Sequence, residues 1–403
     1  MTIVKMLCFS FPAFGMNISD VGITGGDRRF FEVAKRLAEK KAKIGVLATD
    51  TGAALCQREG LKNIDVHLIQ PPLLFDWVFK TTVKFQNLHI LATYIFAPLL
   101  ALFKIPKLPP CNVVYSQSDF ISDTMLAFFC KTILRMKWAA ITYHIIPSPF
   151  QREGNLIMNV LSFISQQISW FLVRRSDLVM ICESVEGERI KKRLLKKGVK
   201  MKRIVMVQVG VDLSYINNIK TSDHKDYDAC FAAALGPVRG LFDIVPVWKR
   251  VVKSKKHSKL IVMGKGSPEY EKAFKEQVHA SGLQDNIIIA GYLTHDPLFE
   301  KMKNSSIFLN LYHETGWALA ITEAMACGLP VVAYDLPAYN IYTKGIIKVP
   351  LLDFDAFAEA IIELIEDNDK RKKLAMEAET MALAYDITRV SEKELSLLKM
   401  ILD

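Results

Sequence analysis

Short apolar runs alternate along this chain with longer segments whose apolar residues recur at helical spacing. Residues 25–43 are one such helical segment, in which Phe30, Phe31 and Leu37 fall on a single face. Alternation of this kind is typical of parallel sheets covered by helices. The apolar runs predict strands at 3–10, 43–48, 112–115, 139–144, 178–182 and 204–208, and again at 229–235, 259–263, 286–290, 306–311 and 331–334.

A polar, charged stretch at 221–229 separates the two groups of predicted strands. We therefore expect two α/β domains, each a Rossmann-like, doubly wound parallel sheet, at residues 1–220 and 221–386. A last helix, at 387–403, has apolar residues available to pack and could return to the first domain. In a pair of such sheets the ligand belongs between the domains, beyond the carboxyl ends of the strands.

Composition narrows the class of protein. The chain has 403 residues, 51% of them hydrophobic, and a formal net charge of +10, which favours anionic partners. Seven scattered cysteines without C-x-x-C spacing are typical of reduced thiols in a cytoplasmic protein, and they disfavour a disulfide or zinc framework. The N-terminus lacks the pattern of a signal peptide and is predicted to begin with a strand.

Three glycine-containing loops could approach a ligand. GGDRR (25–29) follows the first strand and opens a helix, so it is either an anion-binding loop or a plain tight turn. GKGSPE (264–269) lacks the third glycine of a dinucleotide fingerprint and the Ser or Thr of a P-loop. This loop therefore argues against nicotinamide chemistry and Walker-type ATP hydrolysis. The third loop surrounds Gly316.

The segment 315–335, TGWALAITEAMACGLPVVAYD, predicts a loop, a helix, a glycine stop and a strand. Packing alone would explain that order. The helix also carries one carboxylate, Glu323, and charged acceptors bind sugar hydroxyls strongly. The N-terminus of the same helix favours phosphate. The segment therefore offers both parts of a ribose–diphosphate site.

EAMACGLPVV at 323–332 resembles the donor-binding segment of family-4 retaining glycosyltransferases, which have the GT-B fold. The resemblance extends through 24–49, SDLVMICES (176–184), GVD (210–212) and GPVRG (236–240). It implies two Rossmann-like domains facing a central cleft, with the acceptor on the N-terminal side and the nucleotide sugar on the C-terminal side. It also implies an enzyme of the hexosyltransferase type that retains anomeric configuration, acting in the synthesis of a cell-envelope polysaccharide.

The same resemblance implies a role for individual residues. Glu323 would bind the donor ribose, and Gly25 and Gly26 would lie near its diphosphate and the acceptor. His144, at a predicted strand end, resembles the histidine that contacts the transferred sugar, and Arg239 would stabilise the departing diphosphate in place of a metal. The remaining residues expected at the donor are Glu314, Thr315, Gly316 and Leu319. No cofactor or metal is expected, since the nucleotide sugar is a co-substrate.

Three positions depart from the family pattern. The family's first acid lies eight residues before its second, where this chain has Thr315, and Glu314 stands one residue earlier. Ala234 replaces an arginine expected five residues before Arg239, and Val209 replaces an asparagine. These changes favour an alternative function, a catalytically weak or silent GT-B protein that binds sugar nucleotide or scaffolds a partner glycosyltransferase.

The expected partners are a nucleotide-sugar donor, a saccharide or lipid-linked acceptor and, as a further option, an anionic membrane surface on its cytoplasmic side. The apolar stretch 88–103 is too short to span a bilayer, but it lies between lysines at 80, 84, 104 and 107. The basic runs 191–203 and 249–259 are either solvated faces or lipid-docking surfaces. Neither contains an aromatic residue, so nucleic-acid binding is not expected.

Overall fold

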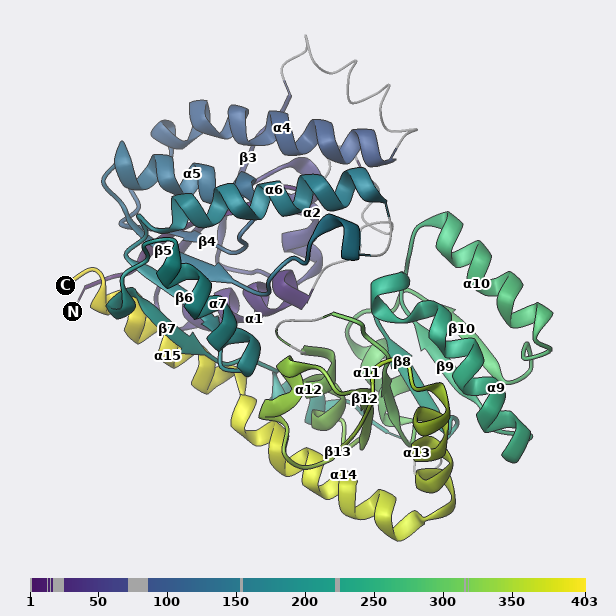
Figure 1. Ribbon diagram of the computed structural model, residues 1–403. Coiled ribbons are helices and arrows are strands. Elements are labelled where there is room, and N and C mark those ends of the chain that lie inside the picture. Colours follow the sequence, from purple (N-terminus) through teal and green to yellow (C-terminus); the bar gives the residue numbers. More distant parts are fainter. Residues whose placement is uncertain are drawn as a thin grey trace.

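The computed structural model describes residues 2–12, 14, 16, 25–71, 86–152, 155–221, 225–314, 317 and 319–403. Two parallel sheets, each flanked by helices, form two domains that face each other (Figure 1). The first sheet has the strand order β3-β2-β1-β4-β5-β6-β7 and the second the order β10-β9-β8-β11-β12-β13. Each order reverses direction beside its first strand, as in doubly wound sheets, so the predicted fold class is confirmed.

The strands of the first sheet are β1 (Lys5–Ser10), β2 (Lys43–Ala48), β3 (Asp65–Leu68), β4 (Val113–Ser116), β5 (Lys137–Thr142), β6 (Leu178–Cys182) and β7 (Ile204–Val207). Those of the second are β8 (Ala229–Ala232), β9 (Leu260–Met263), β10 (Ile287–Gly291), β11 (Phe308–Asn310), β12 (Val331–Tyr334) and β13 (Ile346–Val349). Sequence reasoning missed β3 and β13, which both lie at a sheet edge. An edge strand is partly exposed and need not be a continuous apolar run.

The helices of the first half are α1 (Gly25–Glu39), α2 (Asp50–Arg58), α4 (Gln86–Lys104), α5 (Ile121–Thr132), α6 (Leu156–Val173), α7 (Val185–Lys196) and α8 (Leu213–Asn218). The second half contains α9 (Ile244–Ser254), α10 (Pro268–Ala280), α11 (Asp296–Lys303), α12 (Leu319–Ala326), α13 (Phe354–Glu366), α14 (Asn368–Ala382) and α15 (Ile387–Met400).

Alternate residues of the first sheet face two different helical layers. Leu7 and Phe9 point toward the layer that contains α4, α5, α6 and α7, where they pack in one apolar cluster with Trp138. Met6 and Cys8, on the opposite face, belong to the cluster that includes α1 and α2. This alternation buries both faces of β1, as expected of a central parallel strand.

The last helix, α15, lies against α1 of the first domain, which places both chain ends on that domain (Figure 1). The contact contains a completely buried ion pair between Arg29 on α1 and Glu394 on α15. Tyr115 donates a hydrogen bond from its hydroxyl group to the same carboxylate at 3.1 Å. Arg29 also donates to the backbone oxygen of Gln208 at 3.1 Å, so one guanidinium joins three segments of the chain.

We predict that Arg29→Met lowers the free energy of unfolding by about 3–5 kcal/mol, because it leaves the buried Glu394 carboxylate without its cation. The double variant Arg29→Met/Glu394→Leu should recover most of that loss, since it removes both charges. Denaturant titration of both variants measures the difference. A double variant no more stable than the single one would show that the pair contributes mainly through packing.

Candidate functional site

Two helix N-termini from different domains meet between the sheets. The helix α1 begins at Gly25 and α12 begins at Leu319, and a Cβ atom built on Gly25 would lie 3.7 Å from the Cβ of Leu319. Each helix start carries unpaired backbone N–H groups and a partial positive charge. Their convergence creates a place that favours an anion.

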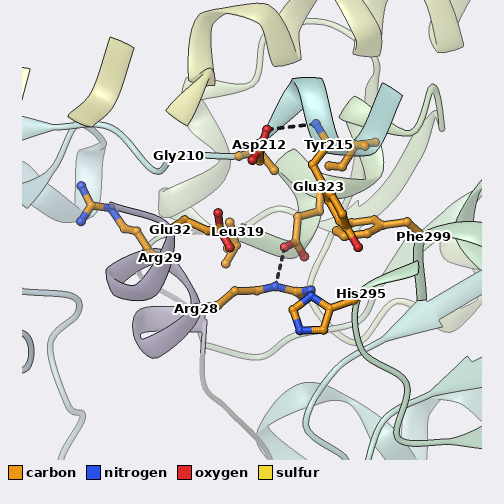
Figure 2. Close-up of a pocket in the computed structure, with 12 residues that line it drawn as sticks. Arg28, Arg29, Glu32, Gly210, Asp212, Tyr215, His295, Phe299, Leu319 and Glu323 are labelled. Atoms are coloured by element: carbon orange, nitrogen blue, oxygen red, sulfur yellow. Dashed lines mark hydrogen bonds and ion pairs between the residues drawn. The ribbon is translucent and has the colours of Figure 1, made fainter. Parts of the chain in front are cut away.

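Glu323 projects toward this junction from the second turn of α12, and it is buried there (Figure 2). Its Oε1 lies 3.3 Å from Nε of Arg28, the fourth residue of α1. The guanidinium of Arg28 also lies over the Phe299 ring, 5.3 Å from its centroid. A carboxylate of one domain is thus paired with a cation of the other across the interdomain boundary.

A cavity of about 30 Å³ lies beside this ion pair. It is lined by Arg28, Arg29, Glu32, Gly210, Val211, Asp212, Tyr215, Ile216, His295, Phe299, Leu319 and Glu323 (Figure 2). A volume of that size holds about one or two water molecules. In this arrangement Arg28 occupies the Glu323 carboxylate, so a ligand that binds this carboxylate would take the place of Arg28.

Burial raises the pKa of Glu323 above its ordinary value, although the neighbouring charge of Arg28 opposes the shift. Glu32 raises the pKa further, because it adds a second negative charge nearby. The carboxylate therefore depends on Arg28 to stay ionised when no other positive or hydrogen-bonding group is present.

A second cluster surrounds Glu314. Arg239 donates from Nη1 to the backbone oxygen of Glu314 at 2.7 Å, and Nη2 of Arg152 lies 2.6 Å from its Oε1. Arg152 comes from the first domain, so this contact also crosses between the domains. Desolvation lowers the pKa of His144; Asp119 and Glu314 oppose that shift, while Arg239 and Arg152 reinforce it.

Backbone geometry fixes the loop that carries Arg239. Gly240, directly after it, has a φ of +72°, in the left-handed region that side chains disfavour. A Cβ atom at this position would lie 1.9 Å from the backbone oxygen of Leu311. The loop therefore needs glycine here to turn tightly against the end of β11. The Arg239 guanidinium then lies 4.7 Å from the Tyr312 ring centroid.

Tyr143 links the two clusters. Its hydroxyl donates to the backbone oxygen of Gly26 at 3.2 Å, and its ring meets that of Trp317 edge-on at 5.2 Å. A Cβ atom on Gly26 would lie 2.9 Å from the Tyr143 ring, so the start of α1 approaches the end of β5 closely because residue 26 is glycine. The next residue, His144, lies within the influence of the charges of Glu314, Arg239 and Arg152 in the second cluster.

The structure thus brings together seven of the nine predicted site residues, Gly25, Gly26, His144, Arg239, Glu314, Leu319 and Glu323. The other two, Thr315 and Gly316, lie outside the described residues. Sequence reasoning missed Arg28, Arg152, Tyr143 and Trp317. Arg28 was within its reach, because it lies in the GGDRR loop, whereas the pairing of Arg152 with Glu314 joins positions 162 residues apart.

Two short stretches of the sequence, DYD (226–228) and DFD (353–355), each contain a pair of acids, and both pairs lie outside the two clusters. Asp353 caps the N-terminus of α13, and Asp355 pairs with Arg250. Asp228 accepts a hydrogen bond from the backbone of Lys259. Within the part of the chain that the structure describes, no three His, Cys, Asp or Glu side chains are grouped so that they could hold a metal ion.

Two Rossmann-like parallel-sheet domains with a site between them are the arrangement of the GT-B fold. Residues 215–381, most of the second domain, match the family Glycosyl transferases group 1. Poly(glycerol-phosphate) alpha-glucosyltransferase of Bacillus subtilis (strain 168) is 29% identical over 163 residues, which are 40% of this chain and 24% of that protein. The mannosyltransferase LpsB of lipopolysaccharide core biosynthesis in Rhizobium meliloti (strain 1021) is 23% identical over 320 residues, 72% of this chain and 82% of its own length.

Solved structures show the same architecture over the whole chain. Anabaena HepE in complex with UDP and glucose superimposes with a TM-score of 0.72 at 15% identity, covering 98% of this chain and 100% of HepE. The pneumococcal O-GlcNAc transferase GtfA, in complex with UDP and GlcNAc, gives a TM-score of 0.75 at 12% identity with full coverage of both chains. The family match therefore applies to residues 215–381, and the solved structures show a shared fold. Membership of the whole chain in the family-4, retaining subclass stays a prediction.

Arg28→Met should make the stability of the protein more sensitive to pH. Because the folded state holds the Glu323 proton more tightly than the unfolded chain, this group lowers the free energy of unfolding as pH rises above its ordinary pKa. Without Arg28 the folded pKa rises further, so the deficit of the variant should grow with pH and reach about 1–3 kcal/mol at neutral pH. Denaturant titration from acidic to neutral pH measures it.

The matched control is Arg28→Met/Glu323→Gln, in which residue 323 no longer titrates while Glu32 is kept. Its stability relative to Glu323→Gln alone should change with pH much less than that of Arg28→Met changes relative to the wild type. A constant deficit in Arg28→Met itself would contradict the electrostatic coupling of the two residues.

Proposed function

We propose that this protein is a retaining glycosyltransferase that transfers a sugar from a nucleotide-diphosphate sugar to a saccharide or lipid-linked acceptor. The observation that carries the proposal is the meeting of the α1 and α12 N-termini beside Glu323, in a chain that matches the group 1 family over residues 215–381. The junction offers two anion-binding helix starts and a carboxylate within the reach of one nucleotide sugar.

In this proposal the ribose hydroxyls of the donor donate to Glu323 and take the place of Arg28. These charged hydrogen bonds then keep the Glu323 carboxylate ionised, as Arg28 does when no donor is bound. Arg28, released from Glu323, lies at the same helix start as Gly25 and Gly26 and can pair with the donor diphosphate. It would thereby supply the second cation that Ala234 does not.

Arg239 and the helix starts stabilise the negative charge that grows on the diphosphate as its bond to the anomeric carbon breaks. The electron pair of that bond leaves with the diphosphate. The acceptor oxygen forms the new bond on the same face of the sugar, and its proton passes to an oxygen of the departing diphosphate. His144, the residue after Tyr143, contacts the transferred sugar in this arrangement and orients it.

The relatives indicate which ligands to try first. HepE has been solved with UDP-glucose and GtfA with UDP and GlcNAc, and the two curated relatives are named for glucosyl and mannosyl transfer. We therefore propose a hexose donor, with a UDP-sugar tested before GDP- and ADP-sugars. The names of the Bacillus and Rhizobium relatives suggest a cell-envelope glycopolymer as the acceptor.

A silent sugar-nucleotide-binding protein is the second candidate. The favouring observation is that Arg152 already holds the Glu314 side chain, 2.6 Å away, while position 234 is alanine. In this alternative the donor still binds at Glu323 but is not consumed. Incubation with UDP- and GDP-sugars and acceptor extracts separates the two, because only the enzyme releases nucleotide.

Donor binding should raise the thermal unfolding temperature of the wild type, since a ligand at 100 times its dissociation constant adds about 2.7 kcal/mol to stability. Glu323→Gln should weaken that binding by roughly 1.5–3 kcal/mol, because a neutral amide replaces a charged acceptor. Isothermal titration with the best UDP-, GDP- or ADP-sugar measures the loss. Equal affinity in the variant would remove Glu323 from the donor site, and no shift with any donor would contradict the proposed function.

Arg239→Ala should reduce turnover more than donor affinity, because its charge acts mainly on the departing diphosphate. A fall of about 100-fold in kcat with a small change in KM is expected for the loss of one such group. Lys301 is the matched control, since its Nζ lies over the Tyr227 ring, 5.6 Å from the centroid, outside both clusters. If Lys301→Ala slows turnover as much as Arg239→Ala does, the role assigned to Arg239 is wrong.

A further inference from the structure

The helix α6 has its apolar residues on the outside. A stripe at spacings of four and three residues consists of Ile157 (70% exposed), Leu161 (39%), Ile164 (48%), Ile168 (42%) and Phe171 (54%). By length and composition, α6 is also apolar enough to cross a membrane, and it is the single such helix among the described residues. Only 28% of it is buried. A core helix of the same composition would bury that stripe.

The inward face of α6 carries three buried polar residues, Asn159, Gln166 and Ser169, beside the apolar Trp170 and Val173. Gln166 accepts a hydrogen bond from the backbone of Ile146 at 2.9 Å and donates to the backbone oxygen of His144 at 2.8 Å. Its Nε2 also lies 2.9 Å from the carboxylate of Asp119, and Ser169 bonds to Thr124 at 2.9 Å. The helix is therefore held in place by these hydrogen bonds together with Trp170 and Val173, and its outer apolar stripe stays available to another surface.

Neighbouring helices extend the exposed apolar surface. The helices α4, α5 and α6 lie side by side on one face of the first sheet (Figure 1). Exposed apolar residues on α4 and at the end of α5 include Ile95, Leu99, Phe103 and Ile133, and Phe150 is 84% exposed just before α6. We call the outer side of these three helices the α4–α6 face. Of the aromatic residues of α4, Tyr94 is exposed, whereas Phe96 packs inward.

A cationic helix borders this face. The sequence of α7, VEGERIKKRLLK, contains five basic residues against two acidic ones. Its Arg189 and Arg193 line a groove of about 470 Å³ together with Phe163 of α6 and the backbone segment 145–148 that follows His144. Among the described residues, Glu186, 3.5 Å from Arg189, is the one acidic residue that lines this groove.

We propose that the α4–α6 face docks on an anionic bilayer, with α6 lying in the plane of the interface and Arg189 and Arg193 against the lipid phosphates. Three observations select this occupant. The apolar stripe suits insertion to the level of the acyl chains, the adjoining cations suit anionic headgroups, and both ends of α6 return to the first sheet, so the helix lies along the surface and does not cross it.

A second copy of this chain fits less well. A symmetric contact through the same face would bring the two α7 helices, and two chains of net charge +10, toward each other. The bilayer instead complements that charge. The groove is lined by Ile145, the residue after His144. Docking would therefore bring lipid-linked molecules close to the interdomain site. This role in acceptor access goes beyond the transfer reaction proposed above.

The test is flotation of the full chain with vesicles of phosphatidylcholine alone or mixed with phosphatidylglycerol, at low and high salt. Wild type should float with the anionic vesicles. Arg189→Gln/Arg193→Gln should bind them about 30-fold more weakly at low salt, since each cation near an anionic surface contributes about 1 kcal/mol. Ile164→Gln/Ile168→Gln should lose at least about tenfold in binding at both salt concentrations, because apolar insertion is not screened.

Matched controls carry the same changes on the second domain. Met376→Gln/Leu383→Gln alters two residues that are 62% and 61% exposed, and Lys272→Gln/Lys275→Gln removes two surface charges from α10. Both should float as the wild type does, and thermal unfolding of every variant checks that it folds.

Three outcomes would overturn the proposal. The first is a wild type that does not float at low salt, and the second is an α6 variant that floats normally. The third is a wild-type dimer in solution that the α6 variant dissociates, which would show that a second copy covers the stripe. Donor binding in solution is measured in parallel and should be unchanged in the α6 variant, so failure of docking and failure of the proposed transfer reaction are distinguishable.

Discussion

One buried guanidinium organises the interface between the two domains. Arg29 pairs with Glu394 of the returning helix α15, donates to the Gln208 backbone, and lies over the Trp317 ring at 4.5 Å. It therefore connects α1, the crossing after β7, the last helix and the loop before α12. Burying such a charge is costly unless it is fully paired, so these partners must assemble together.

Arg28, the residue before Arg29, lies in the same first turn of α1, and its side chain points toward Glu323 of the second domain. The same turn of α1 thus supplies one arginine for architecture and one for the ion pair with Glu323. Because Glu323 is buried and its pKa is raised, whatever displaces Arg28 must replace its charge or its hydrogen bonds. In the proposed function, donor binding and domain arrangement would therefore be coupled through this one pair of side chains.

The helix α6 has a comparable double role. Its polar side holds the backbone after β5 through Gln166, and Gln166 touches the segment that contains His144. Its apolar side faces outward. Apolar residues of this kind are normally buried in the core of a protein. Their exposure on α6 is explained if they contact another surface, as in the proposed docking on a bilayer.

Local patterning alone determined most of the architecture of this protein. Continuous apolar runs predicted the central strands, because these are buried on both faces, and the EAMACGLPVV segment located Glu323 and its helix. The edge strands β3 and β13 were not predicted, because partial exposure makes the apolar pattern of a strand weaker. Tertiary structure alone decided the pairing of Arg28 with Glu323, of Arg152 with Glu314 and of Arg29 with Glu394. Each joins residues far apart in the chain, and burial, which no local pattern encodes, makes each charge depend on its partner. The outward apolar stripe of α6 was likewise invisible in composition, because a helix rich in Ile, Leu and Phe is ordinarily a core helix, and only packing reveals which side faces the sheet.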